Sequence, residues 1–257
     1  MNTLLKVKKL LGGLKEICLS GCLPRDLTIL KSELRVQRAR RRRFMLDLIP
    51  SDSVGAEIGV FTGLFSSMLA RDRRISKVTF VDPWWKAFGS HYPDWGISTD
   101  YGRLSTQSAY EVARIRVSRC GLPNRFVEVA FSYDWLAAQP DGSLDWEYLD
   151  STHDYEGTQR ELQLLDRKIS DTGIILGDDW IIDPDDINYG VFLAVGEFVK
   201  SSNFELILCG QHRQWAIRRV PLNRTPPKPS SFTLIAESAW RRQMHFKPEG
   251  PQPATQP

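Results

Sequence analysis

The stretch VGAEIGVFTG, residues 54–63, decides the fold, because an apolar strand pattern there turns into a glycine turn ahead of a helix. Gly59 and Gly63 let the backbone pass close beneath a ligand, since neither residue carries a Cβ atom. The preceding Glu57 makes the pattern Glu-x-Gly-x-x-x-Gly, and the Gly-x-Gly-x-x-Gly pattern that seats a dinucleotide is absent. The stretch therefore favours a ligand with a cationic group over a pyrophosphate.

Strand and helix patterns alternate along the rest of the chain. Strand-like apolar runs are found at Val54–Val60, Lys77–Val81, Phe126–Ala130, Leu144–Leu149, Gly173–Leu176, Phe204–Cys209 and Gln214–Arg219. Helical patterns lie at Leu64–Arg71, Leu104–Arg119, Tyr133–Ala138, Tyr155–Ile169 and Val191–Lys200. This alternation predicts a doubly wound α/β fold, a mostly parallel seven-stranded sheet with helices on both faces. The short turn Gly210–Arg213 predicts that the last two strands form an antiparallel hairpin at the sheet edge.

Composition excludes several classes of protein. The chain has 257 residues, of which 42% are hydrophobic and 25% are charged, so it is neither disordered throughout nor collagen-like. Its four cysteines lack Cys-x-x-Cys spacing, which argues against a disulfide framework or a cysteine zinc site and favours a cytoplasmic location. No apolar run approaches the roughly 20 residues that cross a bilayer. Lysines interrupt the apolar N-terminus, unlike the core of a signal peptide.

Positive charge is concentrated at the N-terminus. Residues 1–50 hold 12 Lys and Arg against 4 Asp and Glu, and the remainder is acidic, which argues against a nucleic-acid surface spread over the fold. One helical pattern covers residues 1–22 and is broken by Gly12-Gly13, and a second runs from Pro24 to Leu48. The run Arg40–Arg43 is either a solvated helix face or a dock for anionic lipid or nucleic acid.

These patterns divide the chain into three parts. We expect a basic helical N-terminal appendage at residues 1–44, one α/β domain at 45–220, and a proline-rich, partly disordered tail at 221–257. The basic appendage makes peripheral contact with the inner membrane face an expectation. The oligomeric state stays open, a homo-oligomer included.

Two further residues fit a cofactor cleft. Asp82 is the first polar residue after the second strand, where an acid can accept hydrogen bonds from both hydroxyls of a ribose. The alternative is a turn or capping residue before Pro83. Ser132 opens the helix after the third strand, where it can bond an adenine edge or cap the helix.

The sequence resembles the class I S-adenosylmethionine-dependent O-methyltransferases over residues 45–220. The resemblance rests on the glycine stretch, on Asp82, and on the segments 149–157 (LDSTHDYEG) and 177–180 (GDDW). It is nearest to the macrocin-type sugar O-methyltransferases and cephalosporin-hydroxylase-like proteins. It implies a Rossmann-like methyltransferase fold with strand order 3-2-1-4-5-7-6, the last strand antiparallel. It also implies that S-adenosylmethionine is held by Glu57, Gly59, Gly63, Asp82 and Ser132.

Three carboxylates follow neighbouring strands in that order. Asp150 ends the fourth strand, and Asp178 and Asp179 end the fifth. Three carboxylates without a nearby cysteine suit a hard cation, and the family carries metal ligands at the matching positions, so we expect Mg²⁺ here. Successive strand residues point to opposite faces, so Asp178 and Asp179 share a metal only if the strand has already ended. The alternative is that one of them caps the next turn.

His153 is the candidate general base, working with Asp150. Histidine is the side chain best suited to removing a proton near neutral pH, and catechol-type relatives carry a basic residue at this spacing. Thr152 stands where many sugar-directed members have an acid, so His153 takes over that work or the substrate is already acidic. The alternative for His153 is a first-turn helix residue bonded to a carboxylate.

The segment 84–101 is long for a connection and rich in aromatic residues, as expected of a substrate lid that packs against a sugar or planar ring. We therefore expect an enzyme that transfers a methyl group from S-adenosylmethionine to a hydroxyl of a small molecule or glycan. A hydroxylase-like metal enzyme is one alternative. A non-catalytic binding or scaffolding protein on the same fold is another.

Overall fold

The computed structural model describes residues 3–36 and 39–221, and they contain a seven-stranded sheet in the order β3-β2-β1-β4-β5-β7-β6. The strands are β1 (Ser53–Ile58), β2 (Ile75–Asp82), β3 (Arg125–Val129), β4 (Leu144–Leu149), β5 (Ile169–Gly177), β6 (Phe204–Cys209) and β7 (Trp215–Arg219). β1 to β5 pair in parallel, and β7 runs antiparallel to both β5 and β6. The predicted fold class, strand order and edge hairpin are confirmed.

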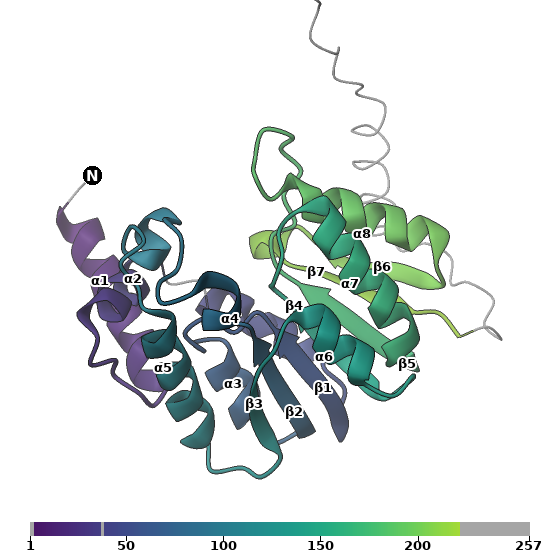
Figure 1. The fold of residues 1–257 in the computed structure, drawn as a ribbon, viewed down its shortest axis with the longest axis horizontal. Coiled ribbons are helices and arrows are strands. Elements are labelled where there is room, and N and C mark those ends of the chain that lie inside the picture. The colour runs from purple at the N-terminus through teal and green to yellow at the C-terminus, as the bar shows by residue number, and fades with distance from the viewer. Residues whose placement is uncertain (1–2, 37–38, 222–257) are drawn as a thin grey trace, which may run out of the picture. The chain divides into compact units, whose positions relative to one another are not determined.

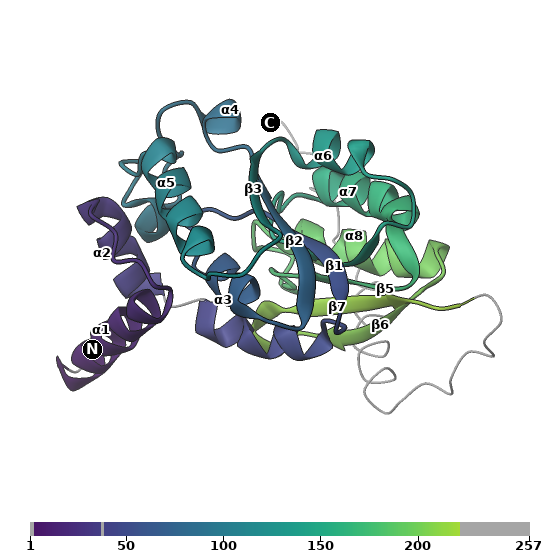
Figure 2. The same cartoon turned by 90° about the horizontal axis from the view of Figure 1, so that it is seen from below.

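Helices cover both faces of the sheet (Figures 1 and 2). The α-helices are α1 (Thr3–Leu19), α2 (Leu27–Val36), α3 (Ser66–Arg71), α4 (Trp85–Phe88), α5 (Thr106–Ser118), α6 (Ser132–Ala138), α7 (Tyr155–Lys168) and α8 (Tyr189–Ser201). Three 3-10 helices are η1 (Ala39–Leu48), η2 (Gly96–Thr99) and η3 (Gln211–Arg213). Figure 2 shows α6, α7 and α8 on one face, with α3 on the other.

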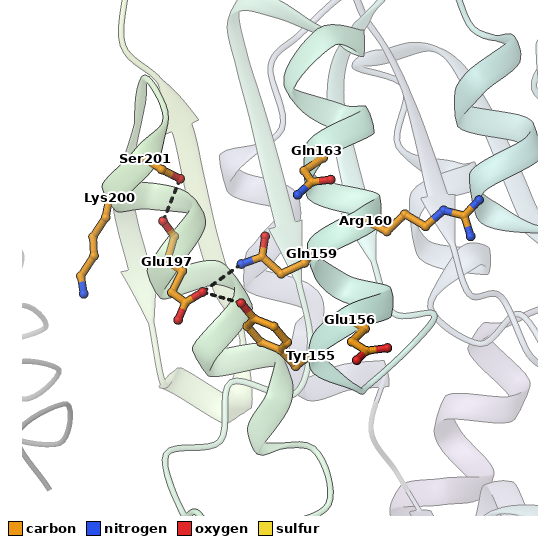
Figure 3. A pocket seen from close by; sticks show the side chains of 8 residues that line it. All are labelled: Tyr155, Glu156, Gln159, Arg160, Gln163, Glu197, Lys200 and Ser201. Atoms are coloured by element: carbon orange, nitrogen blue, oxygen red, sulfur yellow. Dashed lines mark hydrogen bonds between the residues drawn. The ribbon is translucent and has the colours of Figure 1, made fainter. Parts of the chain in front are cut away.

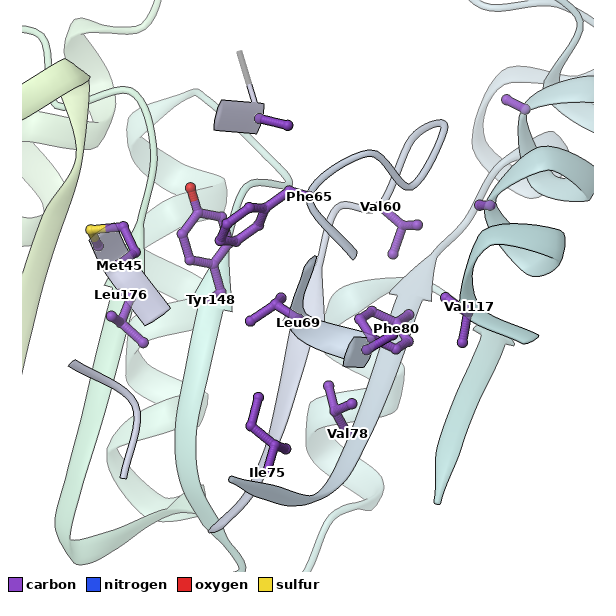
Figure 4. Packing of buried hydrophobic residues seen from close by; sticks show 14 of the residues in the cluster. Met45, Val60, Phe65, Leu69, Ile75, Val78, Phe80, Val117, Tyr148 and Leu176 are labelled. Carbon is purple, nitrogen blue, oxygen red and sulfur yellow. The ribbon is translucent and has the colours of Figure 1, made fainter. Parts of the chain in front are cut away.

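Alternation along the strands divides the core between the two faces. On β4, Trp146 and Tyr148 are fully buried and join the apolar cluster that includes Phe65 and Met45 (Figure 4). Glu147, between them in sequence, points to the opposite face, where its charge lies near that of Glu161 on α7. Because side chains alternate between the two faces of the sheet, the first residues after each strand also point to one face or the other. This alternation decides where the polar residues of the site lie.

The N-terminal helices differ from their predicted bounds. α1 continues through Gly12-Gly13 as far as Leu19, whereas the sequence pattern predicted a break there. A Cβ atom on Gly13 would lie 2.8 Å from the Leu34 backbone, so this glycine permits the close crossing of α1 and α2. The predicted helix from Pro24 to Leu48 is replaced by α2 and then η1.

None of the helices within residues 3–36 and 39–221 combines the length and the apolar character needed to cross a bilayer. The predicted tail at 221–257 lies outside the described residues except for Pro221.

Candidate active site

The glycine turn after β1 lies directly against the loop that follows β4. Gly59 has a φ of 93°, and a Cβ atom there would come within 1.8 Å of the Asp150 carbonyl oxygen. Gly63 has a φ of 75° and packs against Ala113 of α5. Phe61 between them is also left-handed, with a φ of 57°, an uncommon conformation for a bulky side chain. The glycine turn and the loop that carries His153 are therefore in contact.

Glu57 is a buried acid at the end of β1. It is 1% exposed, and its Oε2 atom has no hydrogen-bond partner among the described residues. Burial raises its pKa to about 8, and the nearby Asp150 and Asp82 add to the shift. A buried acid with an unused oxygen is suited to a cationic group brought by a ligand, and the role predicted for Glu57 stays a prediction.

Asp82 closes the other side of the glycine turn. Its Oδ2 atom accepts hydrogen bonds from the backbone N–H groups of Val60 and Phe61, both at 2.9 Å, and its Oδ1 atom accepts one from Trp84 at 2.8 Å. Burial raises the pKa of Asp82, although these three N–H donors oppose the shift. The structure thus places Asp82 beside the glycine turn, where it fixes the backbone as a turn residue would.

Ser132 is the first residue of α6, and Phe131 occupies the N-cap position. The buried hydroxyl of Ser132 bonds Glu161 of α7, as do the hydroxyls of Ser151 at 2.6 Å and Thr152 at 3.1 Å. One buried glutamate therefore connects the predicted adenine edge with the loop that carries His153. Glu161 was not singled out in the sequence, where it is one acid among several on α7.

The three predicted metal ligands separate into two groups. Asp150 and Asp178, at the ends of adjacent strands, point to the same face and share one partner, the guanidinium of Arg42 on η1. The second oxygen of Asp178 accepts a hydrogen bond from Gln214 at 2.5 Å. Burial would raise the pKa of Asp150, but Arg42 and His153 hold it below its usual value. Burial raises the pKa of Asp178 to about 6 against the influence of Arg42.

Asp179 lies beside His153, and its φ of 60° is left-handed because the strand has ended. Its Oδ2 atom is 3.4 Å from Nδ1 of His153, whose Nε2 atom is 3.5 Å from Oδ1 of Asp150. The imidazole thus lies between two carboxylates. Burial lowers the His153 pKa, but Asp150, Asp179 and Asp178 outweigh it and raise the pKa to about 9.

The donor set does not fit magnesium. Asp150, His153 and Asp179 have ligand atoms within 4.8 Å of one another, so the group contains an imidazole in place of the Asp178 carboxylate. Mg²⁺ demands octahedral oxygen ligands and seldom takes imidazole. The guanidinium of Arg42 also puts a permanent positive charge beside the carboxylates of Asp150 and Asp178.

Arg42 is the main residue that the sequence prediction missed. In a 3-10 helix, residues three apart share a face, and Ala39, Arg42 and Met45 are all buried on η1. Arg41 and Arg43 are exposed, so the prediction of a solvated face holds for them and is wrong for Arg42. The buried neighbours at spacing three are the signal that could have found it.

The aromatic segment between β2 and α5 has a buried and an exposed part. Trp84 and Tyr92 are almost fully buried, and the Trp84 indole N–H donates to the Phe61 carbonyl at 3.0 Å. Trp95 and Tyr101 are about half exposed, at 49% and 54%. The inner rings therefore pack beside the glycine turn, and the outer ones are exposed to solvent.

An open groove of about 600 Å³ lies elsewhere, between α7 and α8 (Figure 3). Its polar wall includes Glu197, which accepts hydrogen bonds from the Tyr155 hydroxyl at 2.5 Å and the Gln159 amide at 3.4 Å. None of the predicted site residues lines this groove.

Comparison with known proteins finds one family match. Residues 56–180 match the family model of a methyltransferase domain, a span that starts in β1 and includes Asp82, Asp150, His153 and Asp179. The chain gives no match among the curated proteins.

Two solved structures are similar in fold. One is a SAM-dependent methyltransferase from Aquifex aeolicus, 13% identical, with a TM-score of 0.49 over 77% of this chain and 98% of that one. The other is the O-methyltransferase from Bacillus cereus in complex with SAH, 14% identical, with a TM-score of 0.49 over 80% of this chain and 97% of that one. The family match over residues 56–180 and the strand order 3-2-1-4-5-7-6 together give this part of the chain the sequence pattern and topology of a methyltransferase domain.

Proposed function

We propose that this protein transfers a methyl group from S-adenosylmethionine to a hydroxyl group of a small-molecule or glycan acceptor. The observation that carries the proposal is the contact between the two halves of the site. Gly59 of the cofactor turn packs on the Asp150 carbonyl, and His153, the candidate base, follows in the same loop. A methyl donor on the turn and a proton acceptor on the loop would therefore be neighbours.

The residues around the glycine turn fit the cofactor. The unused Oε2 atom of buried Glu57 suits a cationic group, and the left-handed Gly59 and Gly63 leave the turn without Cβ atoms. Asp82 is the last residue of β2, and Ser132 is the first residue of α6. In the proposed complex, Asp82 would bind the ribose and Ser132 the adenine. When bound, S-adenosylmethionine supplies a methyl group on a sulfonium, which is attacked by a nucleophilic oxygen.

His153 is the group that would take the hydroxyl proton. Its ring is 39% exposed, although Nε2 itself is buried, and Asp150 and Asp179 lie on two sides of the ring. These carboxylates favour the charged imidazolium that forms when the proton arrives. Magnesium has no place in this mechanism, because the donor set does not fit it.

The exposed rings of Trp95 and Tyr101 support an acceptor with a sugar or planar face. The test is turnover with methyl-labelled S-adenosylmethionine and a panel of hydroxylated glycosides and phenols. The expected result is one methyl group added to the acceptor and one S-adenosylhomocysteine released. Oxygen added to the acceptor would favour the hydroxylase alternative, and cofactor binding without turnover on any acceptor would favour a binding protein.

A second candidate role, peripheral membrane contact, rests on α1. Val7, Leu10, Leu11 and Leu14 lie at helical spacing and are each 43–61% exposed, and Lys8 and Lys15 are exposed on the same helix. An apolar stripe accompanied by lysines suits the surface of an anionic membrane. We propose that α1 brings the enzyme to the inner face of the cytoplasmic membrane, where an amphipathic acceptor would be met.

A further inference from the structure

A buried arginine lies where the sequence predicted a metal ion. Nη1 of Arg42 donates to Oδ2 of Asp150 at 2.5 Å, and Nη2 donates to Oδ2 of Asp178. Only 10% of the Arg42 side chain is exposed. The planar fork of a guanidinium suits two carboxylates side by side, and here they stand at the ends of adjacent parallel strands.

The core holds this arginine in place. Met45, one turn further along η1, is 1% exposed and belongs to the same apolar cluster as Tyr148 and Leu176 (Figure 4). The Arg42 guanidinium lies 6.0 Å from the centre of the Tyr148 ring. Arg42 cannot leave the two carboxylates by a simple loop movement, because its helix is packed into the core. It is a fixed part of the site.

The surroundings of Asp178 complete the arrangement. Its Oδ1 atom accepts from the Gln214 amide at 2.5 Å, and Oε1 of Gln214 accepts from the Tyr148 hydroxyl at 2.5 Å. Both oxygens of Asp178 are therefore engaged by donors from the chain itself. A divalent ion at this carboxylate would have to displace a charged, buried partner, which is costly because it leaves the guanidinium without compensation.

We propose that Arg42 is the resident cation of this site and takes the place of a divalent metal. Its fixed charge holds Asp150 by one oxygen, while the other oxygen of Asp150 lies 3.5 Å from Nε2 of His153. Arg42 thereby acts as a positioning residue for the candidate base, through Asp150. The role of Arg42 in positioning His153 rests on the proposed function. The identity of the cation at the site can be tested without any acceptor.

The test measures the binding of Mn²⁺ to the full chain. Binding is monitored by the loss of the electron paramagnetic resonance signal of the free ion and by calorimetry. Wild type is expected to show no stoichiometric site. Arg42→Ala and Arg42→Gln, which free Asp150 and Asp178, are expected to bind one equivalent. Arg42→Lys keeps a positive charge and is expected to remain free of metal. Arg43→Ala removes an exposed charge from the same run and is the matched control, expected to behave as wild type.

Two outcomes would overturn the inference. One is a stoichiometric Mn²⁺ site in wild type that Asp179→Ala abolishes. The other is a folded Arg42→Gln variant that does not bind Mn²⁺, because Asp150 and Asp178 would then not form a cation site even without the arginine. If Arg42→Ala does not fold, the wild-type, Gln and Lys measurements still decide. A failure of methyl transfer on every acceptor would contradict the proposed function and leave the metal measurements unchanged.

Discussion

Two titratable side chains make the site sensitive to pH at the scale of single residues. Glu57 is held neutral at pH 7 by burial, and His153 is held positive by its two carboxylates. Each must lose a proton before it can do what we propose for it, Glu57 to meet a cation and His153 to accept a proton. Both changes favour activity above neutral pH.

Glu57 links cofactor binding to proton release. Its pKa of about 8 lies above the usual value, so below pH 8 binding of a cationic ligand must first remove a proton. We expect the affinity for S-adenosylmethionine to fall as pH falls below 8, by up to about tenfold per pH unit. Calorimetry in buffers of different ionisation enthalpy measures the released proton. Glu57→Gln should bind more weakly and with little pH dependence; a variant that keeps the wild-type slope would remove Glu57 from the cofactor site.

The pH dependence of turnover reports the protonation of His153. A base with a pKa of about 9 is mostly protonated at pH 7, so turnover should rise with pH up to about 9. Asp179→Asn removes one of the charges that raise this pKa and should move the midpoint to lower pH. Asparagine tolerates the left-handed backbone at this position, so the fold should survive. His153→Ala should lower turnover by about 10²–10⁴-fold and leave cofactor affinity intact.

An unshifted midpoint in Asp179→Asn would show that another group controls the profile. Rates are best compared with cofactor and acceptor saturating, so that the Glu57 effect on binding does not enter.

At the scale of elements, the N-terminal helices support the cofactor turn. Arg116 of α5 is fully buried and forms an ion pair with Glu33 of α2 through two hydrogen bonds, at 2.5 and 2.8 Å. The same guanidinium donates to the Thr62 carbonyl in the glycine stretch at 2.8 Å and to the Ser20 hydroxyl at 2.9 Å. Deleting residues 1–22 would therefore remove a partner of Arg116, and point substitutions are the better test of the N-terminus.

Breaking this pair should cost stability and cofactor affinity together. Glu33→Gln leaves the buried Arg116 charge uncompensated, which typically costs about 3–5 kcal/mol in the free energy of unfolding. We expect a lower denaturation midpoint and weaker cofactor binding, since Arg116 also holds Thr62. The control is Arg119→Ala, in which an exposed arginine loses one bond to the Gly21 carbonyl at a small cost. Equal stability losses in the two variants would contradict the importance of the buried pair.

At the scale of the whole molecule, charge is unevenly distributed along the sequence: the N-terminal 50 residues are basic and the remainder is acidic. The exposed leucines of α1 lie within the basic end. Attraction to an anionic surface and burial of apolar side chains would then act on the same helix.

This predicts binding to anionic vesicles that salt weakens. Wild type should cosediment with phosphatidylserine-containing vesicles and less so with neutral ones, and the binding should fall as ionic strength rises. Leu10→Ser together with Leu11→Ser should reduce it, because both side chains are exposed at 48% and 61%. Turnover on a soluble acceptor should not change in this variant. Equal binding of neutral and anionic vesicles would exclude the electrostatic part of the proposal.

The amino-acid sequence by itself determined the order of the elements and the position of the glycine turn. Strand and helix periodicity is a local property, so β4 and β6 were predicted at their observed bounds, and the other strand bounds lay within a few residues. The glycine spacing at Gly59 and Gly63 and the acid that ends β2 are likewise local patterns. Alternation also gave the rule that Asp178 and Asp179 could not share a face within a strand.

The tertiary structure alone decided the partners of the carboxylates. Arg42 and Asp150 are 108 residues apart in sequence, and the spacing that would mark Arg42 as buried applies only once a 3-10 helix is known to form there. That choice follows from a 3-10 helix whose buried face at Ala39 and Met45 carries Arg42 with it into the site. The pairing of Asp178 with this arginine and of Asp179 with His153 follows from where β5 ends. Long-range packing and the exact end of a strand are set by the whole fold, because each depends on which surfaces meet.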